Sequence, residues 1–205
     1  MATQIERSSA TQTRLIDATI SLLDELGYAR LSETRICERA GVSRGALRHH
    51  FPSGRYDLLP VVVERLVAAE EARFIALGPL TPLERVHLML HSTLAYPEHS
   101  TSVALLQIWM AARGDAKLYD GVGPIFDSVL PRLFGLDAKM PSDPQTLALR
   151  FLLHGAALHR FNADFDVDNL RAALRWILAL VEQPTSFVEH FGAFAARPVL
   201  ETESA

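Results

Sequence analysis

Apolar residues recur at spacings of three and four along almost the whole chain, and no segment shows the strict apolar–polar alternation of a half-buried strand. One such stripe contains Leu15, Ala18, Leu22 and Leu26. It stops at Gly27, a residue suited to the left-handed backbone found at helix ends. The pattern therefore predicts an all-α protein.

The glycine and proline residues that interrupt this periodicity mark the expected helix boundaries. We expect helices at 11–26, 32–40, 43–50, 56–77, 83–96, 102–113, 117–134, 144–161 and 169–182. The tail after Pro184 has room for one more short helix. The helices at 144–161 and 169–182 carry Leu, Ala and Phe on more than one face, so we expect both to be mostly buried.

Composition narrows the class of protein. With 205 residues, of which 49% are hydrophobic and 21% charged, the chain can bury a core and is not of the disordered type. A single cysteine, Cys37, excludes an internal disulfide and favours a reducing compartment. We expect a cytoplasmic protein, because the chain has no apolar run of membrane-spanning length and its first residues do not resemble a secretory signal.

Charge is distributed unevenly. The total of −4 argues against a nucleic-acid partner, but the window from Arg30 to Tyr56 holds six arginines and two glutamates, a net charge of +4. The rest of the chain therefore carries −8. A basic segment in an acidic chain is the charge distribution expected of a local nucleic-acid interface.

The segment 32–51 within this window reads as a helix, a tight turn and a second helix. Ser32 is a suitable N-cap, Ile36 and Ala40 are the inward positions of the first helix, and Gly41 permits the turn. Val42 and Leu47 are expected between the two helices.

The second helix of this segment would present polar and small side chains outward: Ser43, Arg44, Gly45, Arg48 and His49. Such a helix fits the major groove of DNA, where arginine can pair with guanine or bind phosphate. The alternative is a helical hairpin whose arginines form an ordinary solvated face.

Position by position, the segment resembles the DNA-binding domain of the TetR family of bacterial transcriptional regulators. The resemblance extends over about 50 residues and is carried by Arg14–Ala18, Leu22–Tyr28, Ile36, Ala40–Ser43, Gly45, Leu47, His50-Phe51 and Leu58-Leu59. It implies that the DNA contacts come from Ser32, Ser43, Arg44, Gly45, Arg48, His49, His50 and Arg55.

Three positions depart from the family pattern. Arg48 stands where a tyrosine is usual, and Cys37 replaces a common alanine, for which we expect a packing role. The lysine that usually opens the fourth helix is replaced by Gly54-Arg55, so Arg55 is expected to contact phosphate.

The resemblance also implies a domain organisation. Residues 1–55 would form a three-helix DNA-binding domain with the helix-turn-helix, 56–77 a linking helix, and 78–205 a larger helical domain that binds an effector and dimerises. Segment 78–82, rich in proline and glycine, marks the boundary.

Two sets of residues are assigned within this larger domain. Polar groups in apolar helices, together with neighbouring aromatic and apolar residues, suggest a ligand pocket lined by His87, His91, Gln107, Trp109, Met110, Tyr119, Val122, Phe126, Phe151 and His154. The family's four-helix dimer bundle implies an interface at Leu152, Gly155, Ala156, His159, Leu174 and Ile177. Each histidine taken singly is also compatible with an ordinary core or surface position.

The motifs typical of enzymes are missing from the sequence. There is no Gly-x-Ser-x-Gly elbow, phosphate-binding glycine loop or Cys-x-x-Cys pair. His87 and His91 have metal-ligand spacing but no clear third ligand, so neither a metal nor a cofactor is predicted. The resemblance to TetR regulators thus implies a homodimeric one-component repressor that binds a palindromic operator on double-stranded DNA and is released by a small molecule. The alternatives are a DNA-binding protein that senses nothing and a helical interaction module.

Overall fold

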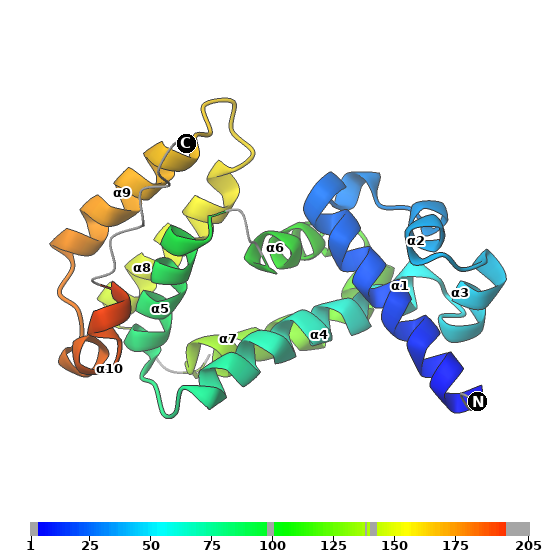
Figure 1. Ribbon diagram of the computed structural model, residues 1–205, viewed down its shortest axis with the longest axis horizontal. Coiled ribbons are helices and arrows are strands. Elements are labelled where there is room, and N and C mark those ends of the chain that lie inside the picture. Colours follow the sequence, from blue (N-terminus) through cyan, green and yellow to red (C-terminus); the bar gives the residue numbers. More distant parts are fainter. Residues whose placement is uncertain (1–3, 98–100, 138, 140–142, 196–205) are drawn as a thin grey trace, which may run out of the picture. The chain divides into compact units, whose positions relative to one another are not determined.

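The computed structural model describes residues 4–97, 101–137, 139 and 143–195, and these residues confirm the all-α class. Figure 1 shows the helices in chain order. They are α1 (Gln4–Leu26), α2 (Glu33–Ala40), α3 (Arg44–His50), α4 (Arg55–Ala76), α5 (Pro82–Ala95), α6 (Thr101–Ala112), α7 (Ala116–Phe134), α8 (Pro144–His159), α9 (Val167–Leu180) and α10 (Thr185–Ala195), with a 3-10 turn η1 (Tyr28–Arg30) after α1.

The predicted helices all exist, and the main difference is the start of α1. It begins at Gln4, seven residues before the predicted start at Thr11. Apolar periodicity does not reveal this first stretch, because Ser8, Ser9 and Ala10 are exposed and bury no stripe. The short helix allowed for after Pro184 is α10.

The chain forms two compact units. The first contains Met1–Arg73 and Thr101–Arg132, hence α1 to α4 together with α6 and α7. Helix α1 packs on α2, α3 and α6, and α6 also packs on η1. Fully buried leucines from several helices, among them Leu15, Leu23, Leu47 and Leu58, form its core.

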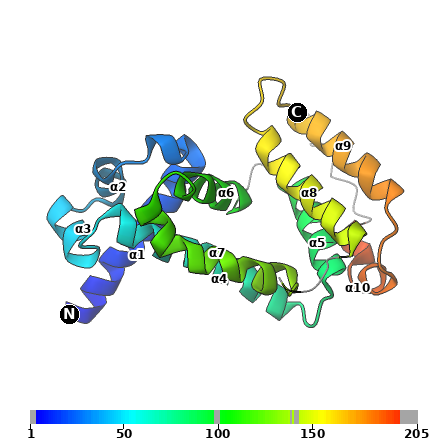
Figure 2. The same ribbon diagram turned by 180° about the vertical axis from the view of Figure 1, so that it is seen from behind.

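Helix α7 lies along α4, as both Figure 1 and Figure 2 show. The side chain of Arg132 joins the two helices: it donates hydrogen bonds to Glu64 at 2.8 and 2.9 Å and to Glu71 at 2.8 Å. These three residues form a charged clamp between α4 and α7. The compact units group α6 and α7 with α1 to α4, and the domain boundary expected at 78–82 stays a prediction.

The second unit contains Phe74–Ser100 and Leu133–Ala205. Helix α5 packs on α8 and α9. It begins with a capping box in which Thr81 and Glu84 each accept the other's backbone N–H. Leu90 and Leu174 are buried at its centre, at 0% and 1% exposed.

Helices α8 and α9 also present large apolar side chains to the surface. Phe151 and Leu158 of α8 are 64% and 49% exposed, and Trp176 and Leu180 of α9 are each 66% exposed. We expected both helices to be mostly buried. Within the protomer this expectation is wrong for one face of each helix. None of the helices in the described residues is long and apolar enough to cross a membrane.

Candidate DNA interface

Three local interactions build the helix-turn-helix. The hydroxyl of Ser32 accepts the backbone N–H of Arg35 at 3.3 Å and caps α2. Gly41 ends α2 in the left-handed conformation, with φ 62° and ψ 41°, where glycine meets no steric cost. The hydroxyl of Ser43 accepts the N–H of Ala46 at 3.1 Å and starts α3. The predicted turn and first cap are confirmed.

Apolar side chains fix the angle between α2 and α3. Ile36 and Leu47 are fully buried and Ala40 is 7% exposed, whereas Val42 is half-buried. Phe51, which follows α3, is 1% exposed. Packing on this inner side directs the opposite side of α3 to solvent.

The exposed side of α3 begins with Arg44. Ser43, Gly45 and His49 are exposed beside it, and His50 is half-buried with its ring 5.2 Å from that of His49. Within the described residues, Arg44 has no ion pair. Its guanidinium is thus available to a base edge or a phosphate.

Arg48, one turn later, has an acidic partner. Its Nη2 donates to both carboxylate oxygens of Glu33, at 3.0 and 2.9 Å, and its Nη1 donates to the carbonyl of Pro52 at 2.8 Å. Glu33 also accepts the backbone N–H of Arg55 at 3.3 Å. It lies so close over Gly54, whose φ is 64°, that a side chain there would overlap the carboxylate. Arg48 therefore ties α3 to α2 and to the start of α4.

Two more arginines of the basic window carry acidic partners. Arg39 pairs with Glu25 of α1, at 2.6 and 2.7 Å. Arg55 donates to the hydroxyl of Tyr56 at 3.2 Å and lies 3.7 Å from Asp115. The net charge of the window thus overstates the charge available to DNA.

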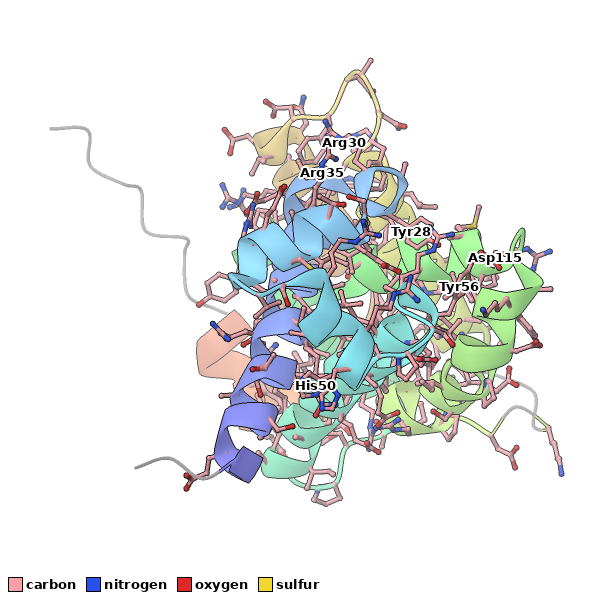
Figure 3. The ribbon with its side chains drawn as sticks, turned by 90° about the vertical axis from the view of Figure 1, so that its right-hand side faces the viewer. Tyr28, Arg30, Arg35, His50, Tyr56 and Asp115 are labelled. Atoms are coloured by element: carbon pink, nitrogen blue, oxygen red, sulfur yellow. The ribbon has the colours of Figure 1, made fainter. Side chains whose placement is uncertain are left out.

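Two exposed arginines that sequence reasoning counted but did not assign lie in η1 and α2. Arg30 donates to the carbonyl of Leu26 at 3.1 Å, and Arg35 to the carbonyl of Arg30 at 2.7 Å. Figure 3 shows these two arginines side by side and His50 at a distance from them. Neither has a carboxylate partner among the described residues, so both keep their charge uncompensated. Both arginines lie in the basic window from Arg30 to Tyr56, and this position in the sequence could have assigned them to the DNA interface.

The segments on either side of the helix-turn-helix, η1 and the start of α4, are bonded to α6 and to Asp115, the residue before α7, within the first unit. The side-chain oxygen of Gln107 accepts the N–H of Tyr28 at 2.6 Å, and Tyr56 donates its hydroxyl to Asp115 at 3.1 Å. Lys117 lies over the Tyr56 ring, 4.6 Å from its centroid. Figure 3 shows Tyr28, Tyr56 and Asp115 gathered on one side of the unit.

The residues assigned to a ligand pocket are divided between the two units. Gln107, Trp109, Met110, Tyr119, Val122 and Phe126 belong to the first, and His87, His91, Phe151 and His154 to the second. Gln107 already binds Tyr28, Val122 is fully buried, and Trp109, Met110 and Tyr119 are exposed. Phe151 lies on the exposed face of α8.

Burial disfavours the charged form of three histidines of the second unit, His87, His91 and His154. Desolvation lowers the pKa of His87 to about 4, helped by His91, and it lowers the pKa of His91 as well. Burial and then the charge of Arg150 lower the pKa of His154. The described residues contain no group of three or more His, Cys, Asp or Glu side chains that could hold a metal ion.

The residues assigned to a dimer interface differ in accessibility. Gly155 is exposed, and Leu152, His159 and Ile177 are half-buried. Ala156 and Leu174 are buried inside the protomer, at 6% and 1% exposed, so they offer no surface to a partner.

Cys37 is 5% exposed in the core of the helix-turn-helix. Burial raises the pKa of its thiol, with the Glu33 carboxylate adding to the effect. A protonated, buried thiol fits the packing role expected for this residue.

Geometry and sequence comparison define the class of this protein. The caps, the left-handed turn and the exposed basic face of α3 make a helix-turn-helix DNA-binding domain. Residues 15–59 match the family model "Bacterial regulatory proteins, tetR family". Residues 15–59 are thus similar to the DNA-binding domain of TetR-family regulators.

Similar proteins match more of the chain than the family model does. An uncharacterized HTH-type transcriptional regulator of Mycobacterium tuberculosis is 34% identical over 118 residues, which span 57% of this chain and 60% of that protein. The HTH-type transcriptional regulator CymR of Pseudomonas putida is 40% identical over 80 residues, 38% of this chain and 39% of CymR. The crystal structure of a TetR transcription regulator from Haloarcula marismortui is similar to this chain with a TM-score of 0.54 and 22% sequence identity. The likeness covers 90% of this chain and 98% of that one, and it shows a shared fold.

Proposed function

We propose that this protein is a one-component transcriptional repressor of the cytoplasm that binds a palindromic operator as a homodimer and is released by a small-molecule effector. The observation that carries the proposal is the exposed Arg44, without an ion pair among the described residues, at the start of a capped recognition helix. Side chains at this end of such a helix reach base edges in the major groove. Arg30 and Arg35 add positive charge for the phosphates.

The exposed faces of α8 and α9 support a dimer. On α8 the exposed positions Ala148, Phe151, Gly155 and Leu158 follow one another at alternating spacings of three and four, which places them on one stripe. Trp176 and Leu180 form a similar stripe on α9. A second copy would bury these side chains in a helix bundle, and a twofold dimer matches a palindromic site.

The bonds from η1 and α4 to Gln107 of α6 and to Asp115, the residue before α7, support an effector response. A shift of α6 would pull Gln107 from the N–H of Tyr28, and a shift of α7 would pull Asp115 from Tyr56. An effector acts only if it has different affinities for the binding-competent and incompetent dimers. These two contacts join the end of α1 and the start of α4 to helices outside the helix-turn-helix.

A salt series tests the DNA-binding part. The full chain is titrated into a fluorescent duplex from the upstream region of its own gene and into a scrambled duplex of equal length. We expect tighter binding to the first, with a logarithmic affinity that falls linearly with the logarithm of salt concentration. Equal affinity for both duplexes, or none for either, contradicts the proposal.

A further inference from the structure

Two buried histidines lie one turn apart on the same face of α5. His87 is fully buried and His91 is 7% exposed. Within the described residues, neither ring nitrogen of His87 has a hydrogen-bond partner, and Nε2 of His91 has none. Buried polar atoms in folded proteins almost always have partners, so three such atoms on one helix face indicate that a partner is missing.

Phe187 of α10 occupies the space in front of both imidazoles. Its ring stacks on His91, with centroids 5.4 Å apart and an interplanar angle of 24°, and lies 5.6 Å from His87 at an angle of 43°. The ring is fully buried, and Phe191 follows it at 5.2 Å. Phe187 thus fills the place with apolar surface but offers no hydrogen bond to the imidazoles.

Helix α10 is a short element. It has 11 residues, and a helix of this length is marginal without tertiary contacts. One polar link to α5 is the hydroxyl of Ser186, which donates to Glu84 at 2.5 Å. Val188, next to Phe187, is 49% exposed, so the helix has a buried and a solvent-facing side. Such an element can leave its site at lower cost than a helix of the core.

We propose that His87 and His91 form a binding site for an uncharged aromatic molecule that carries a hydroxyl group, and that Phe187 is the built-in occupant which this ligand displaces together with α10. The proposal rests on the effector-responsive function proposed above and deepens it, since it names the site and the class of ligand.

The polarity of the site determines the ligand class. A neutral imidazole has one donor and one acceptor nitrogen, so one hydroxyl can donate to one ring and accept from the other. An aromatic ring on that hydroxyl takes over the stacking place of Phe187. Glu84, 4% exposed on the same helix, places a carboxyl group one turn before His87 and disfavours an anion.

The test uses phenol, toluene and benzoate with the full-length protein. Toluene has the shape of phenol without its hydroxyl, and benzoate carries a charge. Each is titrated at millimolar concentration while the ¹⁵N resonances of the histidine side chains are recorded. We expect phenol to shift the resonances of His87 and His91 and benzoate to shift neither. Toluene should bind at least about tenfold more weakly than phenol, because it lacks both hydrogen bonds of the hydroxyl and one bond alone is worth about that factor. Amide hydrogen exchange of residues 185–191 should rise when phenol binds.

Variants at Phe187 and at its neighbour Val188 test whether the Phe187 ring itself competes with the ligand. Phe187→Ala removes the competing ring and should strengthen phenol binding about tenfold, whereas Val188→Ala, one position along and exposed, should leave it unchanged. In His87→Leu the preference for phenol over toluene should shrink, because only His91 can still bond the hydroxyl. The comparison of phenol with toluene uses the wild-type protein, so it does not depend on whether any variant folds.

Equal affinities for phenol and toluene, or phenol binding that leaves both imidazoles and α10 unaffected, overturn the proposal. Operator affinity is measured separately with and without phenol. Binding at the imidazoles without a change in operator affinity supports the site and overturns the effector-responsive part of the proposed function. Operator release by another compound, with no phenol bound at the imidazoles, overturns the site and leaves the function standing.

Discussion

Arg48 of the recognition helix is bonded to Glu33 of the preceding helix, with one guanidinium nitrogen donating to both carboxylate oxygens at 3.0 and 2.9 Å. The side chain of Glu33 is only 17% exposed and that of Arg48 is 49% exposed. The resemblance placed Arg48 among the DNA contacts, at a position where the family usually has tyrosine. In the structure Arg48 supports α3 from the side of α2.

This ion pair predicts that Glu33→Gln changes operator affinity in the direction opposite to that expected from charge alone. Removing a negative charge near DNA normally strengthens binding, because repulsion of the phosphates falls. If Glu33 positions α3 through Arg48, the variant should instead weaken operator binding several-fold and lower the free energy of unfolding by about 1 kcal/mol. Fluorescence anisotropy and urea unfolding give the two quantities.

A double-mutant cycle with Arg48→Ala completes that test. The two substitutions should be non-additive, since either one removes the same ion pair. If Arg48 contacts phosphate directly, Glu33→Gln would strengthen binding. In that case Arg48→Ala would lower the salt slope by about one for each phosphate that the arginine neutralises.

Arg44→Ala should weaken operator binding by about 1–3 kcal/mol and relax the preference at one base position of each half-site. The reason is that Arg44 is exposed at the start of α3 and has no ion pair among the described residues. Binding selection from a randomised operator library measures both effects. Arg65→Ala is the matched control, because it removes one exposed arginine of α4, outside the helix-turn-helix. Unchanged base preference in Arg44→Ala would show that this residue does not read sequence.

Gly155→Trp should prevent the proposed dimer from forming without disturbing the protomer. Apart from the neighbouring residues and backbone of α8 itself, nothing in the described protomer lies within 4 Å of a Cβ added at Gly155, so the new side chain projects into free space unless a second copy is there. Sedimentation velocity should show monomer at micromolar concentration, and operator affinity should fall with it. Ala69→Trp, on an exposed position of α4, should remain dimeric. A Gly155→Trp protein that sediments as a dimer would place the interface elsewhere.

Acid should weaken the fold through the buried histidines. His87 has a pKa of about 4 in the folded protein against 6.5 in the unfolded chain, so the unfolded chain binds more protons between these pH values. The free energy of unfolding should therefore fall as pH decreases from 6.5 toward 4, by at most about 1.4 kcal/mol per pH unit for this residue. The lowered pKa values of His91 and His154 act in the same direction.

Urea unfolding at several pH values measures this dependence. His87→Leu should flatten the curve in this range, whereas His49→Gln, at an exposed position, should keep the wild-type slope. Parallel curves for wild type and His87→Leu would mean that His87 is protonated in the folded state.

The amino-acid sequence by itself determined the helices and the helix-turn-helix. Helix periodicity, the Ser32 cap and the Gly41 turn depend on residues close together in the chain, and each prediction agrees with the structure. Burial of Ile36 and Leu47 followed from the same local pattern.

Only the tertiary structure decided which charges and polar groups are free. Glu25 and Asp115 lie 14 and 60 positions from the arginines they pair with, Arg39 and Arg55, so no local pattern reveals these ion pairs. The same holds for Phe187, which reaches the imidazole of His87 from 100 positions away. Long-range contacts depend on how helices pack, and packing sets both the desolvation of a side chain and the partner it meets.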